Sequence, residues 1–183
     1  MASNWMRQFQ RRYVANIFKS HHAAPLLAPL LPGLLDEYKI FYIQRDGRDV
    51  MTSFWIYLNR LAPGWGPRTR TVGEFMRATA AGGISQYQPA QQHMTMLQRW
   101  ATHVAGWSQS ELPVHYLTYE ELHTHHDDVL ERIAGILEQP VVSKSRPTLD
   151  APSSLPWKGT IGAWKEFFTA ADREYFDRHT KQI

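Results

Sequence analysis

The residues best suited to chemistry follow one short apolar run. Arg45 comes directly after residues 39–44, and Ser53 lies eight residues further on. A guanidinium forms charge-assisted, bidentate hydrogen bonds to a phosphate, and a hydroxyl near the start of a helix adds a neutral donor. The pair therefore predicts a phosphate-binding site. The alternative is a surface network in which Arg45 and Arg48 pair with the neighbouring Asp residues.

The elements around this pair predict how it is positioned. Residues 39–44, Lys-Ile-Phe-Tyr-Ile-Gln, lack polar alternation, which is typical of a strand buried on both faces. A turn signal and a helix over 50–61 follow, and a helix over 89–109 precedes a second strand at 114–118. This order predicts an α/β fold with a parallel sheet. Ligands of such sheets bind outside the carboxyl ends of the strands, which is where Arg45 lies.

The rest of the chain is predicted to be helices joined by loops. Thr124 and Asp127 have the spacing of a capping box ahead of a helix that carries Val129 and Ile133. The other expected elements are a helix over 4–18, a Pro-rich connection over 23–36, a long surface excursion over 62–88, a loop over 140–157, and closing helical segments over 164–168 and 172–179.

Composition limits the class of protein. The 183 residues suit one domain, 1–183, and 43% hydrophobic with 20% charged residues excludes a disordered chain. A net charge of +3 favours an anionic ligand but is far from the dense basic surface of a nucleic-acid binder. The absence of cysteine excludes thiolate chemistry. No apolar run has membrane-spanning length and no signal-peptide pattern is present, so we expect a cytoplasmic protein with neither membrane nor nucleic-acid partners.

The segment Tyr42–Trp55 resembles the 3′-phosphate-binding segment of the sulfotransferase family: a strand, Arg, then Arg-Asp-Val, then Ser eight residues after the first Arg. The resemblance implies that Arg45 and Ser53 hold the 3′-phosphate of 3′-phosphoadenosine-5′-phosphosulfate (PAPS), with no metal. It also implies the family's fold, a three-layer arrangement related to P-loop nucleotide hydrolases in which helices flank a parallel sheet. The implied activity is transfer of a sulfuryl group from PAPS to a hydroxyl or amine of a small-molecule or glycan acceptor.

Two further segments resemble the same family. Lys19-Ser20-His21 matches its Lys-Thr-His, which implies that His21 is the general base and that Lys19 offsets charge on the sulfuryl group. On its own, a histidine pair beside a Pro-rich loop is typical of solvated surface. The stretch Trp100–Leu122 matches a helix, strand and loop of the family and implies that Tyr119 packs against adenine. An aromatic that only anchors the end of a strand would give the same sequence.

The stretch 157–165 resembles the family's Arg-Lys-Gly signature and implies nucleotide contacts from Lys158 and Gly159. Gly159 and Gly162 in this stretch allow close approach of the backbone to a phosphate. Trp157 stands where the family has Arg, and Ala163 where it has Asp.

A short dimerisation motif of the family keeps three of its anchors here. These are Lys165, Thr169 and Glu174, with Ala170 where Val is usual. The motif implies a homodimer.

The family's first strand and phosphate loop, whose Lys holds the 5′-phosphosulfate, have only a partial counterpart. Residues 2–6 resemble the tail of that loop, with Trp5 in the place of the Trp that stacks on adenine. We therefore expect a truncated or naturally short chain that lacks the first strand of the sheet. The alternative to an active enzyme is a catalytically weak or inactive relative that serves as a nucleotide-binding or assembly module.

A third alternative is a metal site in the His-rich stretch at 123–128. Neighbouring imidazoles and carboxylates can chelate a divalent ion. The competing interpretation is a polar first turn of a helix whose acidic residues interact favourably with the helix dipole. The candidate ligands are His123, His125, His126, Asp127 and Asp128.

Overall fold

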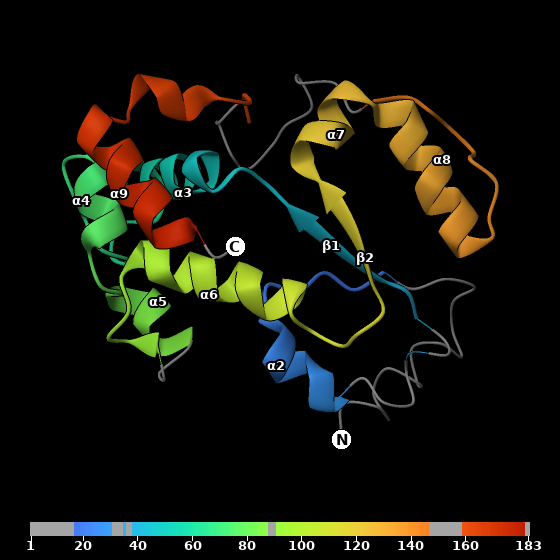
Figure 1. Cartoon of the computed structure of the whole chain (residues 1–183), viewed down its shortest axis with the longest axis horizontal. Coiled ribbons are helices and arrows are strands. Elements are labelled where there is room, and N and C mark those ends of the chain that lie inside the picture. The colour runs from blue at the N-terminus through green and yellow to red at the C-terminus, as the bar shows by residue number, and fades with distance from the viewer. Residues whose placement is uncertain (1–16, 31–34, 36–37, 88–90, 147–158, 182–183) are drawn as a thin grey trace.

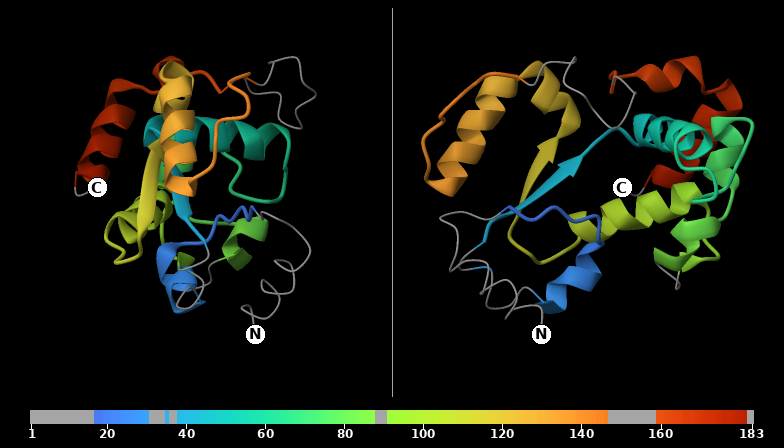
Figure 2. Two further views of the ribbon diagram at one scale, coloured as in Figure 1. Left: turned by 90° about the vertical axis from the view of Figure 1, so that its right-hand side faces the viewer. Right: turned by 180° about the vertical axis from the view of Figure 1, so that it is seen from behind.

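Two parallel strands between two groups of helices form the framework (Figure 1). The structure is a computed structural model and describes residues 17–30, 35, 38–87, 91–146 and 159–181. Strand β1 (Ile40–Gln44) pairs with β2 (Val114–Thr118). Helices α3 (Gly47–Arg60), α6 (Met96–Ser108) and α9 (Ala170–Thr180) lie on one side of this sheet, and α7 (Tyr119–Thr124) and α8 (His126–Leu137) on the other (Figure 2). The predicted α/β class, with helices flanking a parallel sheet, is confirmed.

Both predicted strands are confirmed, and their register aligns their ends. Ile40 is opposite Val114, and Gln44 is opposite Thr118. The strands are less buried than predicted, since Ile43 is 55% exposed and Tyr116 is 44% exposed. The physical reason is the size of the sheet: within the described ranges it has two strands, so each strand is an edge.

Each strand runs directly into a helix with its own cap. Asp46 caps α3 (Gly47–Arg60) by accepting a hydrogen bond from the backbone N–H of Arg48. Thr118 caps α7 (Tyr119–Thr124), and a short break at His125 separates α7 from α8 (His126–Leu137). The remaining elements are α2 (Ala24–Leu27), η1 (Ala28–Leu30), α4 (Val72–Arg77), α5 (Gly82–Tyr87), α6 (Met96–Ser108), η3 (Ala163–Glu166) and α9 (Ala170–Thr180).

The main core lies on the α3 side of the sheet, where α3, α4, α6 and α9 meet. Phe75 of α4 and Leu97 of α6 have no exposed surface. They pack in one cluster with Met51 and Leu58 of α3 and with Phe176 of α9. The prediction of a surface excursion over 62–88 is therefore wrong, because α4 within it supplies core residues. Helix α4 has only six residues and follows Gly- and Pro-rich segments, so its apolar residues do not form a recognisable helical pattern in the sequence.

Two helix starts also differ from the predictions. Helix α6 begins at Met96, where Thr95 and Gln98 form a capping box, and not near residue 89. The expected box of Thr124 and Asp127 does not form, because the Thr124 hydroxyl donates to the backbone carbonyl of Glu120. Thr118 and Glu121 form a box one helix earlier.

Of the helices predicted at the two ends of the chain, those at the carboxyl end are confirmed and the one at the amino end is not tested. The helix expected over 4–18 lies largely outside the described residues, and residues 17–18 are not helical. The closing segments are confirmed as η3 and α9. In the part of the chain that the structure describes, no helix is both long and apolar enough to cross a membrane.

Candidate functional site

Arg45 and Tyr119 lie side by side at the carboxyl ends of the two strands. Each follows directly on a residue of the last pair in the register, Gln44 with Thr118. The guanidinium carbon of Arg45 is 4.4 Å from the centroid of the Tyr119 ring, within the range of a cation–π interaction. Parallel pairing thus joins two predicted site residues that are far apart in the sequence.

Gly159 completes this cluster from a third segment. The Tyr119 hydroxyl donates to the carbonyl of Gly159 at 2.8 Å, and Arg45 Nη2 donates to the carbonyls of Gly159 and Thr160 at 3.4 and 3.0 Å. Gly159 has a φ of +62°, and a Cβ there would lie 2.2 Å from the Tyr119 hydroxyl. The close approach and the left-handed backbone together explain why this position is glycine.

Asp49 fixes the loop that carries Gly159 and balances the charge of Arg45. Its carboxylate, 1% exposed, accepts hydrogen bonds from the backbone N–H groups of Gly162 and Trp164 at 2.7 and 3.0 Å. One of its oxygens lies 3.6 Å from Arg45 Nη2. The sequence predicts Asp49 only as an ion-pair partner of the neighbouring arginines, and not as the residue that fixes this loop. The only signal for it was its place in the Arg-Asp-Val of the segment that resembles the sulfotransferases.

Arg45 keeps unused capacity to bind an anion. Its Nε is buried and has no hydrogen-bond partner among the described residues, although its side chain is still 15% exposed. A buried N–H without a partner is uncommon in proteins and costs free energy. An oxyanion that accepts from this guanidinium would remove that cost.

Arg48 behaves differently although it lies three residues away. Its Nε and Nη2 both donate to the carboxylate of Asp46, at 2.9 and 2.6 Å, and its guanidinium covers the Trp164 ring. Burial alone would raise the pKa of Asp46, but hydrogen bonds from Arg48 and its charge hold that pKa below its usual value. The alternative of an Arg–Asp network thus describes Arg48 with Asp46 and also Arg45 with Asp49, but the Arg45 pair is longer, at 3.6 Å, and leaves Arg45 Nε without a hydrogen-bond partner among the described residues.

Ser53 lies further along α3 than its expected place near the start of the helix. It is four residues beyond Asp49 and so lies one turn on along the same helix face. The residue is half-buried, and none of the described residues hydrogen-bonds its hydroxyl. No hydrogen bond joins Ser53 to Arg45 among the described residues.

The ring of Tyr119 has a second neighbour. The His123 ring centroid is 4.4 Å from that of Tyr119, in addition to the guanidinium of Arg45. Packing of Tyr119 against adenine stays a prediction.

The candidate catalytic segment is separate from this cluster. Lys19 and His21 are exposed, and no contact joins His21 to Arg45 in the described part of the chain. The segment lies instead beside α6, where Trp107 Nε1 donates to the carbonyl of His22 at 3.2 Å. Two predicted ligand contacts, Trp5 and Lys158, lie outside the described residues.

The metal alternative gains no support. No group of three or more His, Cys, Asp or Glu side chains within the described ranges is placed to hold a metal ion. His126 Nδ1 lies 3.1 Å from an oxygen of Asp127, and His123 contacts Tyr119.

A separate hollow of about 430 Å³ is lined by residues near the far end of α3. None of the predicted site residues lines it. Its lining residues are Asn59, Arg68, Thr69, Arg70 and Glu74.

A comparison with protein families identifies the family of the chain. The model of the sulfotransferase domain matches residues 6–155, so the chain belongs to the sulfotransferase family. The family that the segment around Arg45 resembles is thereby confirmed.

Individual relatives are similar over most of this chain. Sulfotransferase 1B1 of dog is 24% identical over 97% of the chain, and human sulfotransferase 2B1 is 29% identical over 79%. The chain spans 64% of the first relative and 44% of the second. The crystal structure of mouse sulfotransferase SULT7A1 complexed with PAP matches 94% of this chain and 66% of its own, with a TM-score of 0.65 and 19% identity. That likeness shows the fold.

Proposed function

We propose that this chain binds the 3′-phosphate of PAPS and belongs to an enzyme that transfers the sulfuryl group to a hydroxyl or amine acceptor. The observation that carries the proposal is Arg45, whose buried Nε has no hydrogen-bond partner in the described part of the chain and lies at the carboxyl ends of two parallel strands. Membership of the sulfotransferase family supports the choice of donor. Acceptors are small molecules or glycans.

In this proposal the cluster around Arg45 recognises the nucleotide. Arg45 donates to the 3′-phosphate, and the free hydroxyl of Ser53 adds a neutral donor. Gly159 lets the backbone approach the nucleotide closely, and Tyr119 packs against adenine. Lys158 and Trp5 contribute charge and an aromatic surface.

The proposed chemistry belongs to the segment at 19–22. The acceptor oxygen or nitrogen forms a bond to sulfur, and the bond from sulfur to the bridging phosphate oxygen of PAPS breaks. The acceptor's proton passes to the neutral imidazole of His21, and the electron pair of the broken bond stays on the 5′-phosphate of the released adenosine 3′,5′-bisphosphate. Lys19 offsets negative charge on the sulfuryl group during transfer. No metal takes part.

A second candidate function is a nucleotide-binding or assembly module with little or no catalysis. Trp157 favours it, because the family has at this position an Arg that touches the 3′-phosphate. Binding of the nucleotide without a sulfated product, across a wide panel of hydroxyl and amine acceptors, would select this candidate.

Calorimetric titration with adenosine 3′,5′-bisphosphate tests the binding site. We expect the chain to bind it and Arg45→Ala to lose about tenfold to hundredfold in affinity, because a charge-assisted hydrogen bond is removed. Arg132→Ala, which removes an exposed guanidinium paired with Glu121, is the control and should bind normally. If the unchanged chain shows neither heat nor a thermal shift with this ligand, the proposal is wrong.

We also propose a homodimer through the motif of Lys165, Thr169 and Glu174. Thr169 already has a role within the chain, since its hydroxyl accepts from the Asp172 backbone and caps α9. Glu174 is exposed and accepts from Arg178. Light scattering during gel filtration tests the assembly, and a monomer at all accessible concentrations would contradict it.

A further inference from the structure

One side of α6 holds the candidate catalytic segment in place. Trp107, 5% exposed, donates its indole N–H to the carbonyl of His22 at 3.2 Å. Ala23 and Ala24, the next residues, are buried, and Pro25 lies close to Gly106 of α6. The backbone next to His21 is therefore attached to α6, although the side chain of His21 is exposed.

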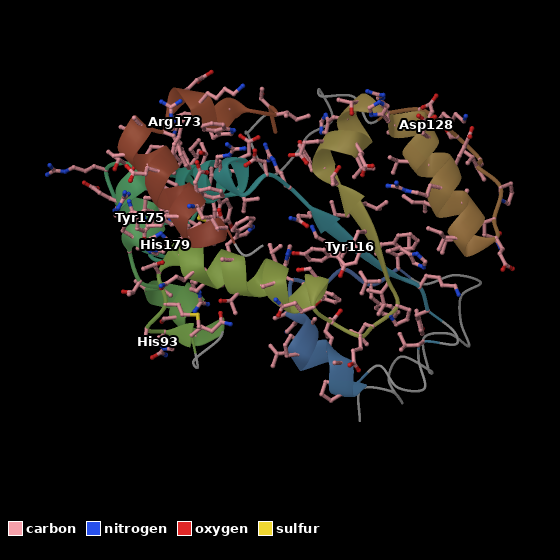
Figure 3. All side chains as sticks on the ribbon, in the orientation of Figure 1. His93, Tyr116, Asp128, Arg173, Tyr175 and His179 are labelled. Atoms are coloured by element: carbon pink, nitrogen blue, oxygen red, sulfur yellow. The ribbon has the colours of Figure 1, made fainter. Side chains whose placement is uncertain are left out.

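Trp107 is itself fixed to the sheet. Its ring stacks on Tyr42 of β1 with centroids 5.2 Å apart, and its backbone carbonyl accepts a hydrogen bond from Tyr116 of β2 at 2.6 Å. Figure 3 labels Tyr116 on β2, beside the end of α6. Tyr42 lies on β1, three residues before Arg45. A chain of contacts through Trp107 and Tyr42 thus connects the His21 segment to the strand that Arg45 directly follows.

We propose that Trp107 is a positioning residue, which sets the place of His21 relative to Arg45 through its indole hydrogen bond to the carbonyl of His22. The proposal rests on the proposed function, in which His21 and Arg45 serve opposite ends of one nucleotide. A fixed distance between them matters, because a reacting group misplaced by about 1 Å costs on the order of a hundredfold in rate.

His103 offers an independent measure of where His21 lies. It precedes Trp107 by one helical turn on the same side of α6, and its ring is 5.9 Å from that of Tyr42. Burial lowers the pKa of His103, and electrostatic repulsion from the nearby His21 lowers it further. Burial and the nearby Tyr116 raise the pKa of Tyr42 to about 12, so Tyr42 adds no charge near neutral pH. Any displacement of His21 from α6 is then expected to raise the pKa of His103.

The test compares two tryptophan substitutions that remove the same kind of hydrogen bond. Trp55 Nε1 donates to the carbonyl of Thr69 at 3.2 Å, the same length as the bond from Trp107. We expect Trp107→Phe to lower kcat about tenfold to hundredfold and to leave the affinity for adenosine 3′,5′-bisphosphate within about twofold. In a titration followed by NMR, the pKa of His103 should rise, as it should in His21→Gln. Trp55→Phe should change none of these.

The proposal is overturned if Trp107→Phe leaves kcat and the His103 titration unchanged, or if Trp55→Phe changes them equally. Should Trp107→Phe fold poorly, benzothienylalanine at position 107 keeps the ring size and lacks the N–H, and the same outcomes apply. Failure of the proposed function is distinguishable, since a chain without turnover still shows the His103 titration. In that case an unchanged titration refutes the role of Trp107, and a raised pKa supports it.

Discussion

The guanidinium of Arg45 has a different partner on each side. It lies against the Tyr119 ring, donates to two loop carbonyls, and faces the carboxylate of Asp49, while its Nε has no hydrogen-bond partner among the residues that the structure describes. Arg48, by contrast, donates through Nε and Nη2 to the two carboxylate oxygens of Asp46. Two arginines in one turn thus differ in their availability to a ligand because their carboxylate partners differ in geometry.

Asp49→Asn tests the loop attachment. The amide has one acceptor oxygen, so one of the N–H groups of Gly162 and Trp164 loses its partner inside the protein. We expect the free energy of unfolding in urea to fall by about 2 kcal/mol. Asp128→Asn, at an exposed carboxylate of α8, is the control, with an expected change of at most about 1 kcal/mol. An equal loss in the two variants would contradict the attachment.

Gly159→Ala tests the contact between the loop and Tyr119. A methyl group there would lie 2.2 Å from the Tyr119 hydroxyl, and the backbone φ of +62° is unfavourable for any residue with a Cβ. We expect about tenfold weaker binding of adenosine 3′,5′-bisphosphate, because Tyr119 or the loop must move. Gly64→Ala separates the two causes, since Gly64 also has a positive φ but no atoms within 4 Å of the added carbon. It should lose stability and keep its affinity.

At the scale of elements, an ion pair joins the closing helix α9 to α4, in addition to their packing in the main core. Arg77 donates to Asp172 at 2.9 Å and lies over the Tyr175 ring at 4.0 Å. Burial alone would raise the pKa of Asp172, but hydrogen bonds from Thr169 and Arg77 lower it below its usual value. The ionised carboxylate is therefore the form that the folded chain favours.

This direction predicts acid sensitivity. Since the pKa of Asp172 is lower in the folded than in the unfolded chain, its contribution to stability is present above about pH 4 and is lost as pH falls through the folded value. Asp172→Asn should lower the melting temperature at pH 7 and differ less from the unchanged chain at pH 3. Thermal denaturation across this range checks it, and a difference that stays constant with pH would contradict it.

The accuracy of the sequence predictions also varies by element. The strands were predictable because each is a short apolar run with a turn or helix signal at its end. Helix α4 was missed, since Val72, Phe75 and Met76 form too short a pattern between Gly, Pro and Arg residues. The availability of Arg45 could not be predicted, because its carbonyl partner at Gly159 lies 114 residues away. The capping box of Thr118 and Glu121 has the same spacing in the sequence as Thr124 and Asp127, so spacing alone does not distinguish the pair that forms from the pair that does not.

At the scale of the whole molecule, the two sides of the sheet differ in how much they bury. Four helices meet around the main core on the α3 side (Figure 2). On the other side, α8 has Val129 as its one fully buried residue. Apolar burial is the dominant stabilising contribution, so the α8 side is expected to be the less stable part.

Hydrogen exchange measured by mass spectrometry checks this difference. We expect amides of α8 to exchange at least about tenfold faster than those of α3 and α6, through local opening that leaves the main core intact. Val129→Ala should speed exchange in α8 and leave α3 unchanged. Uniform protection of all three helices would mean that the molecule opens as one unit.

The aligned strand ends also set the chain's tolerance to changes in length. Arg45 and Tyr119 meet because β1 and β2 stop level with each other. Deletion of one residue inside β1 would move the side chains that follow it in the strand to the opposite face of the sheet. It would also shift Arg45 by about 3.3 Å. A residue added in the loop between α4 and α5 would leave both strand ends level. Homologues that keep this site should therefore vary in loop length and conserve the length of the strands.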